Sequence, residues 1–196
     1  YKYDLGTDLC WRGEYKFVLG CDSMAAIARN WSVVAPDTVK YYLERCTQFD
    51  QPEKRCNSYN CCTNLSQTWA YVRANCSPEI FNLMNSGALI VNYEGHANET
   101  QFTHERLIED SQYHSDILSL TNKEKPFIFM GYGCWISNFD RRREPQRYIQ
   151  DAIGEKFVTS PSGAACACFA SGCAESIDGN LQLNAVSYTH LTLPTK

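Results

Sequence analysis

The sequence has no apolar run of about 18 residues, so it predicts no transmembrane helix. Basic residues are not in excess: 18 lysines and arginines face 22 aspartates and glutamates, for a formal net charge of −4. This balance gives no case for nucleic-acid binding, and the one basic run, Arg141–Arg143, is typical of a solvated loop. The sequence also lacks a C-x-x-C pair, an internal repeat and a low-complexity segment. The missing C-x-x-C pair argues against a zinc site.

What is present fits an ordinary globular protein. The chain has 196 residues, of which 44% are apolar and 20% are charged. That length is enough for one domain with a sizeable core. Neither a disordered nor a fibrous protein has this composition.

Cysteine is abundant, with 11 in the chain. Cytosolic proteins rarely carry so many without a metal, so we expect a secreted or extracytoplasmic protein with several disulfides. The odd count leaves at least one thiol over if all pairing is internal. A zinc site at Cys166, Cys168 and Cys173 is an alternative, but their expected place in a buried strand argues against it. We expect no metal and no cofactor.

Both ends of the chain carry unusual signals. The first residue is Tyr1, without an initiator Met or a signal peptide, and we expect an N-terminal truncation. The tail Val186–Lys196 resembles translated sequencing-adapter sequence, so we set it aside, and His190 with it. A single domain over residues 1–185 with a motif-bearing core at 77–172 is the expected organisation.

Three apolar runs predict buried strands. They are Ala88–Tyr93, the run within Lys125–Trp135 and Gly163–Gly172. The first two lack clean alternation of apolar and polar residues, which is typical of strands covered on both faces in a parallel sheet. Helical patterns lie between and before them. The order of strands and helices therefore predicts an α/β fold with a mostly parallel sheet flanked by helices.

The predicted helices have recognisable ends. Ser77 is a candidate N-cap, Pro78 suits the first helical position, and Gly87 stands where a C-terminal cap is expected. A later helix is predicted around 146–156 and is broken by the Ser-Pro-Ser-Gly segment at 160–163. Between the first two strands, the apolar residues Ile117, Leu118 and Leu120 are expected to pack on the sheet.

A histidine and a cysteine follow the first two strands directly. The runs end at Gly95–His96 and at Gly133–Cys134. Because sites collect at the carboxyl ends of parallel strands, we expect His96 and Cys134 to lie at one edge of the sheet. A cysteine needs a base to be a useful nucleophile near neutral pH, and histidine is the usual partner. The backbone N–H groups of Ala97 and Cys134 could then form an oxyanion hole.

Other residues compete for these roles. Cys21 also follows an apolar run and a glycine, but we assign it to the core or to a disulfide. His104 is an alternative base, although the polar stretch before it favours a loop. Nearby carboxylates could orient His96, and the sequence does not choose among Glu94, Glu99 and Glu105.

Two segments resemble the gingipain-type cysteine peptidases. NSGALIVNYEGHANET (Asn85–Thr100) is similar to the family's histidine segment, in which a strand ends in Gly-His-Gly-Ser-Glu-Thr. PFIFMGYGC (Pro126–Cys134) resembles its nucleophile strand. The resemblance implies a caspase-like fold and peptide-bond cleavage through an acyl-enzyme, with Cys134 as nucleophile and His96 as general base and acid. Ala97 replaces the second glycine of the family's motif.

The leading hypothesis is therefore a secreted cysteine endopeptidase that acts on a protein or peptide substrate. It needs no nucleic acid and no membrane span, and the sequence does not indicate an oligomeric state. The alternative is a disulfide-rich extracellular binding domain on the same fold, without catalytic turnover.

Overall fold

The structure is a computed structural model that describes residues 70, 72–103, 106–139 and 151–192. It divides into two compact units, one made of residues 64–175 and the other of residues 1–63 with 176–196. All the described strands belong to the first unit. Cys21, His104, Glu105 and Arg141–Arg143 lie outside the described residues.

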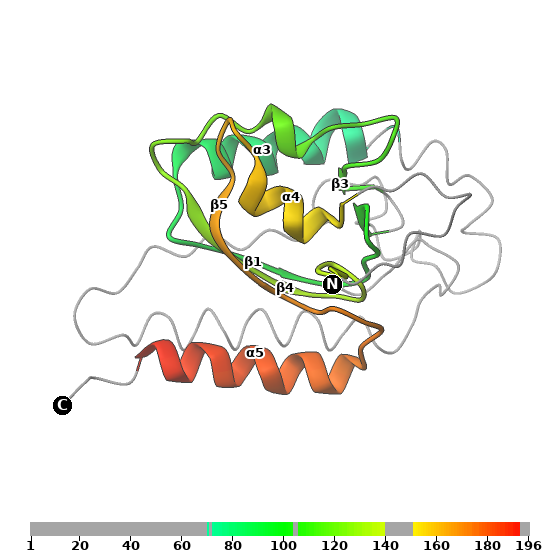
Figure 1. The fold of residues 1–196 in the computed structure, drawn as a ribbon, viewed down its shortest axis with the longest axis vertical. Helices are drawn as coiled ribbons and strands as arrows, with labels where there is room; N and C mark the ends of the chain where they lie inside the picture. The colour runs from blue at the N-terminus through cyan, green and yellow to red at the C-terminus, as the bar shows by residue number, and fades with distance from the viewer. Residues whose placement is uncertain (1–69, 71, 104–105, 140–150, 193–196) are drawn as a thin grey trace, which may run out of the picture. The chain divides into compact units, whose positions relative to one another are not determined.

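The three predicted strands form one parallel sheet (Figure 1). They are β1 (Ile90–Glu94), β4 (Phe127–Tyr132) and β5 (Ala165–Ala170). The order is β1-β4-β5, so β4 is central and pairs in parallel with both neighbours. The α/β class and the parallel sheet are confirmed, and the arrangement is consistent with a caspase-like fold.

The three strands differ in burial. In β4, five of six residues are buried, as an uninterrupted apolar sequence predicts for a strand covered on both faces. In β5 only Ala165 is buried, and Phe169 is 46% exposed. The prediction of a third buried strand is therefore wrong in its burial. Within the described sheet β5 has one strand neighbour, and its small side chains present little apolar surface.

The helix after the predicted cap begins differently from the expectation. A π-helical turn, η4 (Val72–Cys76), leads directly into α3 (Ser77–Ser86). Ser77 is thus the first residue of α3 and not its N-cap. Its hydroxyl donates to the carbonyl of Leu107 at 2.6 Å instead of capping the helix. The far end is as predicted: Gly87 has a φ of 101°, and its N–H donates to the Met84 carbonyl. Glycine adopts this backbone readily.

The first part of the later predicted helix, residues 146–150, lies outside the described residues. Helix α4 covers Ile153–Thr159, with Ala152 as its N-cap. The Glu155 carboxylate accepts from the Ala152 N–H at 2.9 Å. Helix α4 ends before Ser160, as the Ser-Pro-Ser-Gly segment predicts.

Aromatic rings join α4 to the sheet. Phe157 stacks on Phe129 of β4 with ring centroids 4.3 Å apart, and Phe129 stacks on Phe102 at 5.7 Å. All three are essentially fully buried. Helices α3 and α4 lie on the same side of the sheet (Figure 1). The aromatic core therefore covers one face of the sheet.

Residues 95–126, here the crossover segment, connect β1 to its neighbour β4. They contain a small antiparallel pair, β2 (Gln101–Phe102) with β3 (Ile108–Glu109), and a 3₁₀ turn, η5 (Ile117–Ser119). Ile117 and Leu120 are fully buried, as expected, but Leu118 is 57% exposed. The prediction for Leu118 is wrong because a 3₁₀ turn points successive side chains in different directions.

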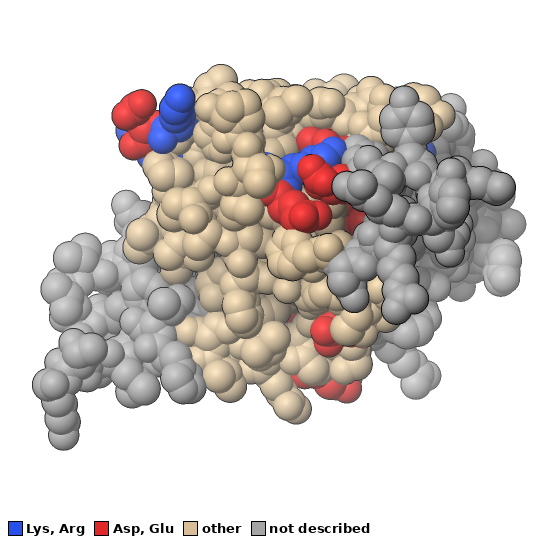
Figure 2. Space-filling view, in the orientation of Figure 1, with Lys and Arg blue, Asp and Glu red and all other residues tan. Residues whose placement is uncertain are grey.

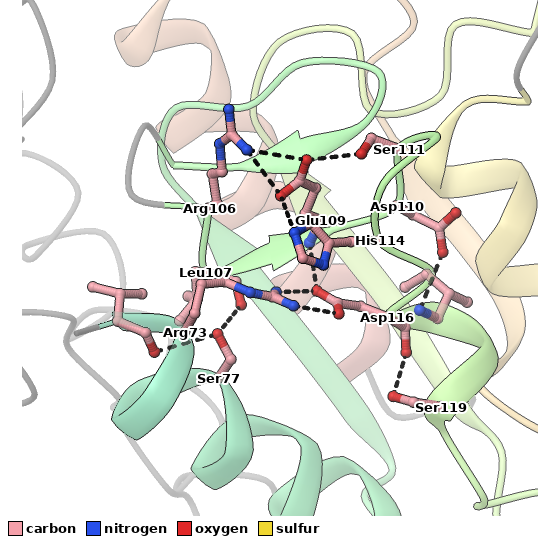
Figure 3. Close-up of polar contacts among 12 residues, drawn as sticks. Arg73, Ser77, Arg106, Leu107, Glu109, Asp110, Ser111, His114, Asp116 and Ser119 are labelled. Atoms are coloured by element: carbon pink, nitrogen blue, oxygen red, sulfur yellow. Dashed lines mark hydrogen bonds and ion pairs between the residues drawn. The ribbon is translucent and has the colours of Figure 1, made fainter. Parts of the chain in front are cut away.

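A network of ion pairs stabilises the crossover segment (Figure 3). Its ion pairs join Arg73, Arg106, Glu109, Asp110, Asp116 and Lys156, and the His114 side chain lies 3.7 Å from the Glu109 carboxylate. Its three acids are at most 7% exposed. Figure 2 shows that charged side chains are sparse on the face it views, where some gather in small clusters of both signs and others are acidic alone.

Two of the buried acids, Asp116 and Asp110, each pair with a cation and with a backbone N–H group. Arg73 forms two hydrogen bonds with Asp116, whose carboxylate also accepts from the Glu109 N–H at 2.7 Å. The Asp116 carboxylate raises the pKa of Arg73 by its hydrogen bond, against the opposing effect of burial. Asp110 pairs with Lys156 of α4 and accepts from the Ile117 N–H at 3.1 Å. The network thus ties the crossover segment to η4 and α4.

Candidate active site

His96 and Cys134 lie the same number of residues after the ends of two neighbouring strands. Strand β1 ends at Glu94 and β4 at Tyr132, and these two residues are paired in the parallel register. Pairing continues one step further, because the Gly95 N–H donates to the Tyr132 carbonyl at 3.2 Å. His96 and Cys134 each come two residues after their strand's end. Both therefore lie at the edge formed by the carboxyl ends of the strands.

The two backbones approach each other closely at this edge. A Cβ atom added at Gly133 would lie 2.6 Å from the Gly95 carbonyl oxygen and 2.9 Å from the Ala97 Cβ. Real Cβ contacts are never so short, so only glycine fits at position 133. This is the close approach that glycine before the cysteine predicts. It brings the segment that carries His96 against the segment that carries Cys134.

Hydrogen bonds fix the backbone around His96. The His96 carbonyl accepts from the Tyr93 hydroxyl and from the Thr103 N–H, the latter at 2.8 Å. The Asn98 side chain accepts from the N–H groups of Thr100 and Gln101, at 2.8 and 2.9 Å. The Tyr93 ring stacks on Phe102 with centroids 4.4 Å apart, which ties this loop to the aromatic core.

Ala97 sits in an antiparallel bridge opposite Phe102. The bonds on either side of the bridge run from Asn98 N–H to the Gln101 carbonyl and from Thr103 N–H to the His96 carbonyl. That pattern makes Ala97 and Phe102 a non-hydrogen-bonded pair, in which each residue's own N–H points away from the partner strand. The Ala97 N–H is therefore not used by the bridge, as an oxyanion donor requires.

Cys134 opens a turn with a strained residue. Trp135, immediately after it, has a φ of 63°, a left-handed conformation that non-glycine residues rarely adopt. Two hydrogen bonds hold the turn to the segment after β5: Trp135 N–H to the Cys173 carbonyl at 3.0 Å, and Ser137 N–H to the Ser171 carbonyl at 2.8 Å. The strain and the two bonds set where the thiol lies.

The Cys134 side chain is a free, partly exposed thiol. Its sulfur accepts from the Glu175 N–H at 3.4 Å, and the thiol can donate to the Glu175 carbonyl at 3.7 Å. The residues at 95–98, 133–135 and 171–175 thus form one surface, here called the site edge.

Two contributors to the site edge, Cys173 and Glu175, have no catalytic role in the sequence-based prediction. A signal for Cys173 was available, because a residue soon after the third strand of a parallel sheet falls at the same edge as His96 and Cys134. Glu175 acts on Cys134 through its backbone N–H, which no residue type specifies. Its contribution could not be read from the sequence.

The remaining candidates lie elsewhere or take other roles. The Glu99 carbonyl accepts from the Ile153 N–H at 2.7 Å, which links the loop after His96 to the start of α4. Glu94 is the last residue of β1. Cys166 and Cys168 lie on β5, away from Cys173 beyond its end. Among the described residues, no group of three or more His, Cys, Asp or Glu side chains is placed to hold a metal ion.

A parallel α/β sheet with a thiol and an imidazole after neighbouring strands is the arrangement of a cysteine-type hydrolase. The sequence model of peptidase family C25 matches residues 9–194. The chain therefore belongs to peptidase family C25, the gingipain family of cysteine peptidases, which confirms the resemblance seen in the two motifs.

The other comparisons add little to this assignment. A search of curated proteins finds no match. One solved structure, described as "Structure of Protease", is 26% identical, with a TM-score of 0.42. The match covers 50% of this chain and 19% of that one, so the chain spans less than a fifth of that protein's length. No described helix is long and apolar enough to cross a membrane.

Proposed function

We propose that this chain is part of a cysteine endopeptidase that cleaves peptide bonds through Cys134 and His96. The observation that carries the proposal is the equal register of the two residues beyond paired parallel strands, Glu94 with Tyr132. Membership of a cysteine peptidase family supports it. The substrate class is a protein or peptide.

In the proposed mechanism, His96 accepts the Cys134 proton and the thiolate attacks the scissile carbonyl carbon. The tetrahedral oxyanion receives hydrogen bonds from the N–H groups of Ala97 and Cys134. The C–N bond then breaks, and the His96 imidazolium donates its proton to the leaving amine. A water molecule deprotonated by His96 hydrolyses the thioester and restores the thiol.

The Glu175 N–H helps to hold the Cys134 sulfur in place before substrate binds, through a hydrogen bond of 3.4 Å. The bond comes from the backbone, so it is present whatever the ionisation of neighbouring side chains.

Hydrolysis of a peptide mixture by wild type and Cys134→Ala tests the proposal. We expect the variant to lose activity by about 10³-fold or more, because removing a nucleophile leaves only binding and oxyanion stabilisation. Cys166→Ala, which removes an exposed thiol of β5, is the matched control and should retain activity. Equal activity in wild type and Cys134→Ala would refute the proposal and favour a binding domain without turnover.

We also propose that the protein acts in a secreted or extracytoplasmic setting, with disulfides among its remaining cysteines. The high cysteine count supports this. Thiol counting of the denatured protein, isolated without reductant, checks it. A full complement of 11 thiols would contradict it.

A further inference from the structure

A second thiol stands beside Cys134 at the site edge. Cys173 lies three residues beyond the end of β5, and its carbonyl accepts from the N–H of Trp135, the residue bonded to Cys134. Backbone segments joined this way are about 5 Å apart. Disulfides join residues whose Cα atoms are about 4.4–6.8 Å apart. The hydrogen bond brings the residue next to Cys134 within about that range of Cys173.

Glu175 contacts both sulfurs. Its N–H donates to the Cys134 sulfur at 3.4 Å, and its carboxylate accepts from the Cys173 thiol at 3.6 Å. Cys173 is exposed and Cys134 is partly exposed, so small oxidants can reach both. The two thiols therefore share one partner residue and one accessible surface.

The two thiols differ in their expected roles. Partial desolvation raises the pKa of Cys173, and the Glu175 carboxylate and the Cys134 sulfur raise it further. Cys173 is thus kept as a thiol. Cys134, by contrast, is the proposed nucleophile, whose proton His96 accepts in the proposed mechanism. One sulfur is suited to react with an oxidant first and the other to follow.

We propose that Cys134 and Cys173 form a reversible oxidation site, in which Cys173 resolves the oxidised form of Cys134. A peroxide oxidises the Cys134 thiolate to a sulfenic acid and is itself reduced to water or an alcohol. The Cys173 sulfur then attacks the sulfenic sulfur, the S–O bond breaks, and water leaves as the disulfide forms. A thiol reductant restores both thiols.

The other described thiols are less suited to this reaction. The Cys166 thiol donates to the Phe127 carbonyl, at the opposite end of the sheet from Cys134. Cys168 lies beside the Ser137 hydroxyl, and burial raises its pKa, which the hydrogen bond to Ser137 only partly opposes. Cys173, by contrast, shares a hydrogen-bonding partner with Cys134, because both contact Glu175.

The consequence builds on the proposed function, because the disulfide removes the proposed nucleophile and protects it from overoxidation. Sulfinic and sulfonic acids form when no neighbouring thiol intercepts the sulfenic acid, and they are not reversed by thiol reductants. Activity that is lost with peroxide and regained with reductant is therefore the expected behaviour of the wild type.

Peptide mapping by mass spectrometry after hydrogen peroxide treatment tests the proposal without relying on activity. The full chain is first reduced, freed of reductant and oxidised. It is then alkylated and digested. In wild type, we expect a Cys134–Cys173 linked peptide that disappears on treatment with dithiothreitol. In Cys173→Ser, Cys134 should progress to the sulfinic acid, with about tenfold less thiol recovered by reductant.

Cys166→Ser is the matched control and should form the linked peptide as wild type does. Equal recovery of the Cys134 thiol in wild type and Cys173→Ser would overturn the proposal, as would linkage of Cys134 to a different cysteine. Circular dichroism checks that the variants are folded. If the linked peptide forms in a protein that cleaves no peptide, the oxidation site stands and the peptidase proposal fails.

Discussion

At the site edge, backbone groups hold the reactive residues, whereas in the crossover segment charged side chains hold one another. The His96 carbonyl and the Cys134 sulfur both accept bonds from groups whose own positions are fixed by strands or by the aromatic core. Asp110 and Asp116 are instead buried and paired with Lys156 and Arg73. The difference separates residues that are held through backbone groups from acids that are held through their own side chains.

Loss of Asp116 should have the largest effect on stability. Asp116→Ala leaves the mostly buried Arg73 guanidinium without its carboxylate and the Glu109 N–H without its acceptor. We expect a loss of about 2–4 kcal/mol in the free energy of unfolding, measured by urea denaturation.

Glu124→Ala removes an exposed carboxylate and should change the stability by less than about 0.5 kcal/mol. The folded fraction of Asp116→Ala should keep its active-site thiol reactive, since the crossover network does not touch Cys134. Surface substitutions usually change the free energy of unfolding by no more than about 0.5 kcal/mol. If Asp116→Ala changes it by no more than that, the contrast between the two regions fails.

Loss of the Tyr93 hydroxyl should have an intermediate effect, on positioning. Tyr93→Phe keeps the stacking on Phe102 but removes a hydrogen bond to the His96 carbonyl, which still accepts from the Thr103 N–H. We expect kcat to fall by about threefold to tenfold with KM nearly unchanged, consistent with a loss of about 1 kcal/mol.

Steady-state kinetics on a peptide substrate give this split between kcat and KM. Tyr113→Phe removes the hydroxyl of a tyrosine that is 76% exposed and serves as the control. If Tyr93→Phe raises KM and leaves kcat unchanged, then the hydroxyl acts on substrate binding and not on the placement of His96.

The smallest predicted effect is on stability at high pH and comes from Cys168, whose thiol lies beside the Ser137 hydroxyl. Burial raises its pKa above the ordinary value of 9.0. A raised folded-state pKa contributes stability that is complete below pH 9 and is lost as the pH rises through the folded-state pKa.

Wild type should therefore lose under about 1 kcal/mol more stability than Cys168→Ala between pH 8 and roughly pH 11. Urea denaturation across this range measures the difference, with Cys166→Ala as the control. Parallel curves for wild type and Cys168→Ala would show that this thiol ionises as freely in the folded state as in the unfolded chain.

The strands could be predicted because an apolar run of this length is itself typical of a strand in a parallel sheet. Ala88–Tyr93 and the run before Cys134 are long enough to be strands and end at glycine, so the positions of His96 and Cys134 followed from the sequence. The helix starts were less predictable. Ser77 has the residue type of an N-cap, but a tertiary hydrogen bond to Leu107 uses its hydroxyl.

The burial of β5 and the backbone contact of the Cys134 sulfur could not be predicted from the sequence. The alanines and cysteines of β5 read as a buried run, yet most of them are exposed or half-exposed. The donor to the Cys134 sulfur is the N–H of Glu175, and any residue except proline provides one there. Cys173 could be placed at the same sheet edge as Cys134 because it follows the third strand, but not in contact with the same residue, because that depends on how the chain turns after β5.

The close packing at Gly133 has a consequence for protein engineering. A methyl group at this position meets both the Ala97 Cβ and the Gly95 carbonyl oxygen. Shortening Ala97 to glycine would remove the first obstacle and leave the second, which is main chain and is present in every variant. Libraries that aim to reshape substrate preference should therefore leave position 133 untouched and diversify position 97, where a side chain is already accommodated.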